Sequence, residues 1–186
     1  MHNYVTTHNS QLRTTMENIL CNIIQRIAET MPDISTVDED YGQLEAIDKQ
    51  DMDTYPLTFP AVLISETETE WSNIGDLAQK GQARIVARLV IDCYDDTHYG
   101  SGTTEAIMNR ADMADRLHKA LQGFRPLDDG PLIRERSRFY TWSHGIKVYE
   151  QHYTVTVSQK VRERVVSEPP HTVSLKVVSS VQSESR

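Results

Sequence analysis

The sequence predicts an α+β fold, in which two main α-helices pack on one face of an antiparallel or mixed β-sheet. Two segments, 11–31 and 104–122, carry apolar residues at helical spacing, whereas other segments alternate apolar and polar residues as half-buried strands do. The predicted strands are joined by short turns, and the helices stand apart from them along the chain. Because strands joined by hairpins pair antiparallel, this order favours α+β over α/β.

The length of the chain sets its domain organisation. A chain of 186 residues can bury one substantial core but is short for two domains. We therefore expect a single α+β domain over residues 1–166 and a C-terminal extension over 167–186. In the extension, residues 172–181 could form a strand before a disordered end. No apolar run approaches the ~20 residues of a membrane helix, and residues 1–11 have neither a basic leader nor an apolar segment, so we expect no membrane helix and no secretion signal.

The ends of both predicted helices are marked by residues that stop helices. The first, over 11–31, is followed by Pro32, which cannot easily continue a helix. The second, over 104–122, is followed by Gly123, which suits the left-handed position after a helix.

The other elements are strands and loops. The acidic stretch 33–55 lacks a sustained period, so we expect a long loop with a short strand around Leu44–Ile47. The further expected elements are a strand beside prolines within 55–68, a loop or hairpin arm over 71–81, and strands over 83–94, 133–142 and 146–161.

The charge balance argues against a protein that grips DNA. Nineteen basic and 27 acidic residues give a formal charge of −8, whereas phosphate binding usually shows as a basic excess. The acidic residues gather in 33–55 and 65–70. We interpret them as solvated loops, with a surface that repels DNA as the alternative.

One turn carries residue types that can bind a metal. Asp95, Asp96 and His98 follow the strand 83–94, at a strand end where ligands and catalytic groups often lie. No further ligand motif accompanies them. A small metal-dependent enzyme or ligand-binding domain that uses these three residues is therefore kept as an alternative.

Residues for nucleophilic catalysis do not come together in the sequence. There is no Gly-x-Ser-x-Gly elbow, and Cys21 and Cys93 are isolated, so we expect both to be reduced, buried thiols. We therefore expect no enzyme, no catalytic residue, no cofactor and no metal.

The strand 83–94 has an unusual second face. Its first row, from Ile85 to Cys93, is apolar, but its second row mixes charged and apolar residues: Arg84, Val86, Arg88, Val90, Asp92 and Tyr94. Either the second predicted helix covers this row within the subunit, or the row contacts another subunit.

The strand 133–142 carries three arginines at alternate positions. Strict alternation would place Arg134, Arg136 and Arg138 on one face, where they repel each other unless acids or solvent neutralise them. We weigh a solvated face, pairing with carboxylates of a neighbouring subunit, and a stripe that binds nucleic acid.

The order of these segments resembles the tail terminator and tail completion proteins of long-tailed bacteriophages and prophages. The resemblance covers about residues 11–161 and is carried by the amphipathic first helix, "FPAVLIS", "ARIVARLVIDCYDD", "TEAIMNRADMADRLHKALQGF" and "YEQHYTVTVSQKV". The acidic stretch 33–55 and the residues after Pro169 depart from the compact family pattern.

This resemblance implies a structural subunit of the virion tail that assembles in the host cytoplasm. It implies a homo-oligomeric ring, usually a hexamer, which ends polymerisation of the tail tube protein and docks to the head–tail connector protein. DNA would pass through without specific binding, and no membrane is involved. A head–tail connector or neck protein is the alternative in the same class. The candidate subunit interface is Arg84, Val86, Arg88, Val90, Tyr94, Arg134, Arg136 and Arg138.

Overall fold

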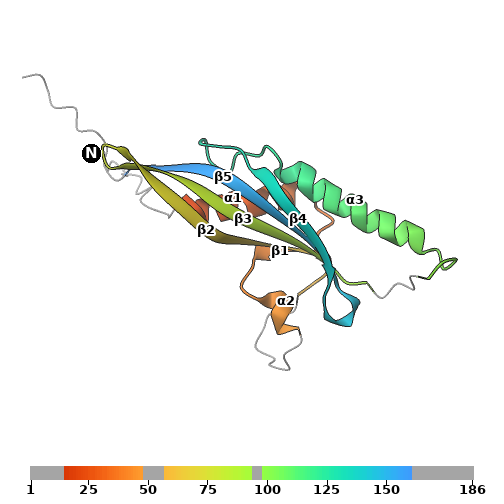
Figure 1. Ribbon diagram of the computed structural model, residues 1–186. Helices are drawn as coiled ribbons and strands as arrows, with labels where there is room; N and C mark the ends of the chain where they lie inside the picture. Colours follow the sequence, from red (N-terminus) through yellow and green to blue (C-terminus); the bar gives the residue numbers. More distant parts are fainter. Residues whose placement is uncertain (1–14, 48–56, 94–97, 161–186) are drawn as a thin grey trace, which may run out of the picture.

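A computed structural model describes residues 15–47, 57–93 and 98–160. Within these residues, five strands form one sheet in the order β1-β2-β3-β5-β4 (Figure 1). Their bounds are Thr36–Glu39 for β1, Ala61–Gly75 for β2, Ala78–Ile91 for β3, Ile133–Thr141 for β4 and Lys147–Lys160 for β5. β1 lies parallel to β2, and the other neighbours are antiparallel. The prediction of an α+β fold with a mixed sheet is confirmed.

Two long helices cover one face of this sheet, which we call the helix face. They are α1, Thr15–Thr30, and α3, Thr103–Leu121, close to the predicted bounds. Their apolar stripes are buried against alternate residues of β2, β3 and β5 and form the larger core: Ile19, Ile23, Ile27, Leu117, Leu121, Val62, Ile64, Ile85, Leu89 and Tyr153. Each fully buried side chain of this size contributes about 1.5–3 kcal/mol.

The two cysteines differ in exposure. Cys93 is buried, but Cys21 is exposed, so the prediction that Cys21 is buried is wrong. Ile19 and Ile23 take the buried stripe of α1, and a residue two positions from either lies on the opposite side of the helix.

A chain of polar groups ties α3 to β5 inside the core. The hydroxyl of Tyr153 donates to Oε1 of Gln151 at 2.6 Å, and Nε2 of Gln151 donates to the carbonyl of Ala114 at 2.9 Å. Nδ1 of His118 lies 3.2 Å from the same hydroxyl. Burial raises the pKa of Tyr153. Burial, together with the charge of Arg134, lowers the pKa of His118, so both groups are neutral at pH 7.

β2 and β3 form a long hairpin, so of the two alternatives predicted for 71–81, a loop or a hairpin arm, the structure has the hairpin arm. Their pairing runs from Ala61 opposite Val90 to Gly75 opposite Ala78. Asp76 and Leu77 form the two-residue turn. Both have positive φ (50° and 58°), which matches the twist of the two strands that the turn joins. The turn lies at the far end of the sheet from α2 in Figure 1.

The acidic stretch contains β1 and a short helix, α2, Gln43–Ala46. The predicted strand around Leu44–Ile47 is therefore wrong. Gly42 turns the chain with φ 98°, and its carbonyl accepts the N–H of Ala46 at 3.0 Å, which starts a helical turn instead.

Candidate subunit interface

The sheet face opposite α1 and α3, which we call the far face, carries the mixed row of β3. Arg84, Val86, Arg88 and Val90 alternate with the core residues of β3, as predicted. Of the two alternatives for this row, the one in which the second long helix covers it is wrong, because α3 packs on the helix face.

The segment around α2 covers one end of the far face. Val90 is fully buried in a second, smaller core together with Leu44, Ala61, Leu63, Ile146 and Val148. Val86 is also buried, at 6% exposure. Neither valine therefore offers contact surface to a neighbour.

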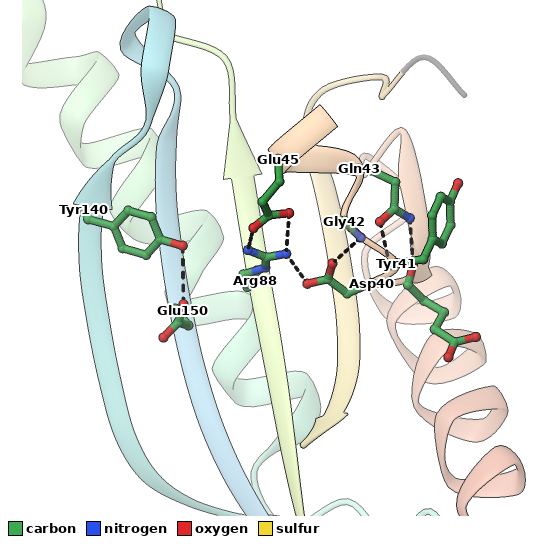
Figure 2. Close-up of polar contacts among 9 residues, drawn as sticks. Asp40, Tyr41, Gly42, Gln43, Glu45, Arg88, Tyr140 and Glu150 are labelled. Atoms are coloured by element: carbon green, nitrogen blue, oxygen red, sulfur yellow. Dashed lines mark hydrogen bonds and ion pairs between the residues drawn. The ribbon is translucent and has the colours of Figure 1, made fainter. Parts of the chain in front are cut away.

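Arg88 fixes the α2 segment to the sheet (Figure 2). Its Nη1 lies 2.6 Å from Oε1 of Glu45, and its Nη2 contacts a carboxylate oxygen of Asp40. The side chains of Arg88 and Asp40 are only 12% and 10% exposed, whereas Glu45 is 39% exposed. The other oxygen of Asp40 accepts the N–H of Gly42 at 3.1 Å. This contact network lies within one subunit.

Arg88 keeps its positive charge in the folded protein. Burial by itself acts to lower its pKa, but the hydrogen bond to Glu45 and the charge of Asp40 outweigh burial, so its pKa is raised. The guanidinium is therefore always charged, and its carboxylate partners are needed to compensate for its lost hydration.

Arg84 forms a more exposed cluster further along the far face. Its Nη1 lies 2.9 Å from Glu68 and its Nη2 lies 3.3 Å from Glu70, with all three side chains more than half exposed. Two carboxylates against one guanidinium leave this cluster with a net charge of −1. Exposed pairs of this kind add little stability, about 0–1 kcal/mol.

The arginines of β4 do not share one face, which corrects the prediction. Arg134 lies opposite Tyr153 and Arg136 opposite the next residue, His152, so Glu135 is bulged out of the ladder. The bulge shifts the alternation: Arg134 lies on the helix face, and Arg136 and Arg138 lie on the far face.

Arg138 and its neighbours form a polar strip on the far face of β4 and β5. Its guanidinium lies 4.4 Å from the centre of the Tyr140 ring. The hydroxyl of Tyr140 lies 3.3 Å from Oε2 of Glu150, as Figure 2 shows, and Nε2 of His152 lies 2.7 Å from Oε1 of Glu150. Arg136 is exposed and makes no ion pair with any residue that the structure describes.

Both edges of the sheet are open over long stretches of the described chain. β4 pairs only with β5, and β1 covers β2 only from Ala61 to Ile64. Large apolar side chains are exposed on these strands and at the hairpin turn: Trp71 at 37%, Ile74 at 59%, Leu77 at 56%, Ile133 at 45% and Phe139 at 56%. Exposed apolar groups beside unpaired backbone are typical of surfaces that contact another protein.

A groove of about 480 Å³ lies beside the β4 edge, between β4 and α3. Phe139 and Tyr149 form its aromatic part, with their ring centres 4.7 Å apart. Asp115 and Arg134 line it with charge. The hydrogen bond from Lys119 and, to a smaller degree, the charge of Arg134 lower the pKa of Asp115.

Sequence reasoning missed the acidic partners of these arginines. Glu66, Glu68 and Glu70 occupy alternate positions, which in a regular strand would place all three on one face. A second bulge, at Thr67, places Glu66 on the helix face and leaves Glu68 and Glu70 on the far face. The proximity of Asp40 and Glu45 to Arg88 depends on tertiary structure and had no local signal.

The remaining candidates are not brought together. Tyr94, Asp95 and Asp96 lie outside the described residues, as does the C-terminal extension, and His98 is exposed. Among the described residues, no group of three or more histidines, cysteines or carboxylates is placed to hold a metal ion. None of the helices described is long and apolar enough to cross a membrane.

Comparison with known proteins gives little. No protein-family model matches the chain, and no curated protein matches it. Among solved structures, it is similar to a chain of a structure described as the virion of a native gene transfer agent (GTA) particle, with a TM-score of 0.45 and 9% sequence identity. The similarity covers 80% of this chain and 100% of that one. A similarity of this size carries no argument about function.

Proposed function

We propose that this chain is a structural subunit of a bacteriophage or prophage tail, and that it ends polymerisation of the tail tube. Copies of the chain form a ring, a hexamer by resemblance, which caps the tube and offers a docking surface to the head–tail connector. The order of the elements carries this proposal. α1, the β2–β3 hairpin, α3 and the β4–β5 hairpin follow one another as the resembling segments of tail terminators do.

The surface of the described residues supports a role in assembly. Its exposed apolar side chains lie along strand edges, and its charged groups form ion-pair clusters on a broad sheet face. Such mixtures of apolar contacts and charges are typical of protein interfaces, where the charges set register and partner choice.

The partners in this proposal are other proteins and the chain itself. The net charge of −8 suits a ring through which DNA passes without specific binding, because acidic groups repel phosphates. No catalytic residue, cofactor, metal or membrane has a part in it. The protein would reside in the virion tail and assemble in the host cytoplasm.

Electron microscopy of the purified chain, alone and mixed with a polymerising tail tube protein, tests the proposal. We expect rings with a central pore and tubes that carry one ring at one end and stop growing there. Binding of rings to the connector but not to tubes would instead indicate the neck protein. Free tubes of unchanged length and no rings would contradict the proposal.

A further inference from the structure

We propose that copies of this chain join head to tail through the two open edges of the sheet, so that β4 of one copy pairs antiparallel with β2 of the next. This inference rests on the proposed ring and names the contact that builds it. The two edges are different strands on opposite sides of the sheet, so the contact is heterologous, and heterologous contacts close into rings when the rotation fits.

The strand directions agree with this junction. β2 and β3, β3 and β5, and β5 and β4 are each antiparallel, so β2 and β4 of one copy run in opposite directions. A second copy in the same orientation therefore brings its β2 antiparallel to the first copy's β4. Such pairing can satisfy the unpaired backbone groups of both edges without inverting either sheet.

The charges of the two edges are complementary on the same face. Arg136 and Arg138 of β4 lie on the far face, and Glu68 and Glu70 of β2 lie on that face too. A sheet that continues from one copy to the next keeps its faces aligned, so these four side chains meet across the junction. Opposite charges on neighbouring strands stabilise pairing, whereas like charges oppose it.

The helix face offers a matching apolar contact. Trp71 of β2 lies on that face, because it is opposite Gly81, and it is 37% exposed. The groove between β4 and α3 opens on the same face and presents Phe139 and Tyr149. At the junction, the tryptophan of one copy lies along the groove of the next, as aromatic anchors of interfaces do.

The junction requires neighbouring copies to be offset along the strands. Ile133, the first residue of β4, is level with Glu68 across the sheet, through Thr154 and Arg84. Within one copy, β4 therefore lies level with the part of β2 before Glu68, which β1 partly covers. The open part of β2 lies beyond the level of Ile133, so a neighbouring copy must be shifted along the strands to place its β2 beside β4. An offset of this kind is what tilted strands in closed sheets have.

The opposing interpretation is that the charges only protect the edges from pairing. Natural proteins do place charged residues on edge strands to prevent aggregation. These edges, however, also expose Trp71, Ile133 and Phe139, which a protected edge would not retain. The two interpretations differ in what reversal of the charges does.

Charge reversal tests the junction in the full-length chain. One variant carries Arg136→Glu and Arg138→Glu, and the other carries Glu68→Arg and Glu70→Arg. The control carries Arg125→Glu, an exposed site beside α1 and away from the charges of both edges, and it gives half the change in net charge of the first variant. Thermal unfolding of each protein establishes that it folds, and sedimentation velocity gives its assembly state.

We expect each edge variant to dissociate, with roughly a hundred-fold rise in the dissociation constant, because like charges then meet at every junction. The control assembles as the wild type does. An equimolar mixture of the two edge variants assembles again, because alternating copies restore opposite charges at every junction.

The possible failures are distinguishable. If both edge variants still form rings like those of the wild type, the proposed junction is wrong, whereas the proposed ring remains. A wild-type chain that stays monomeric at all concentrations and on tubes would overturn the ring as well. A mixture that stays dissociated while the wild type assembles would also overturn the junction.

Discussion

At the scale of single residues, Arg88 decides how the far face is covered. Its guanidinium binds Asp40 and Glu45, which lie on either side of Gly42 at the start of α2. The two arginines of this β3 face differ mainly in burial, because Arg84 also binds two carboxylates but is 51% exposed. A buried pair that loses one partner leaves the other as an uncompensated buried charge, which an exposed pair does not.

We therefore expect Arg88→Met to destabilise the protein far more than Arg84→Met. The loss for Arg88→Met should be roughly 3 kcal/mol, because Asp40 is left buried without its partner. The loss for Arg84→Met should be about 0–1 kcal/mol. Denaturant unfolding of both variants measures the difference. Equal losses would show that Arg88 does not fix the α2 segment.

At the scale of the elements, α3 places His118 beside Tyr153 of β5, where burial favours the neutral imidazole. Burial lowers the pKa of His118 in the folded protein below its ordinary value of 6.5. The unfolded chain therefore binds more protons than the folded one as the pH falls through this value. The contribution of His118 to stability is present above about pH 6.5 and is lost as the pH falls below it.

Unfolding free energies measured from pH 7.5 to pH 5 test this sign. We expect the wild type to lose stability over this range and His118→Gln to lose less of it. His144→Gln is the matched control, because His144 is exposed in the turn between β4 and β5. The same pH slope in His118→Gln and the wild type would contradict the account.

The long elements could be predicted from the sequence because their period is local. The helical spacing of Ile19, Ile23 and Ile27 and the alternation of β5 predict α1 and β5 without any tertiary information. The bulges at Thr67 and Glu135 could not be predicted, since one extra residue in a strand leaves no mark in composition. Each bulge moves every later side chain to the other face, so the face of each arginine and glutamate was not predictable either.

The short helix α2 shows a second limit. Residues 44–47 are too few to show a helical period. Their position is fixed by Arg88, which lies more than forty residues later in the chain. Arg136 and Arg138 lie at an open edge, and their part in a subunit interface stays a prediction. Val86 and Val90 were not correct as contact residues, since burial depends on which distant segment covers them.

At the scale of the whole molecule, the described chain is a sheet with one face covered by helices and with two open edges of opposite charge. Within the described residues, β4 pairs with no strand besides β5, and the edge of β2 that faces away from β3 is unpaired beyond Ile64. The central claim is that a second copy completes each edge, which makes the chain a unit of a larger assembly rather than a finished domain.

Cross-linking with one cysteine at each edge tests this claim most directly. In a Cys21→Ser background, one variant carries Glu68→Cys, a second carries Arg138→Cys, and both are treated with a short, flexible bismaleimide. We expect that neither variant cross-links alone and that their mixture gives covalent dimers, because only unlike edges meet. Dimers from either variant alone, or no dimers from the mixture while rings are present, would contradict it.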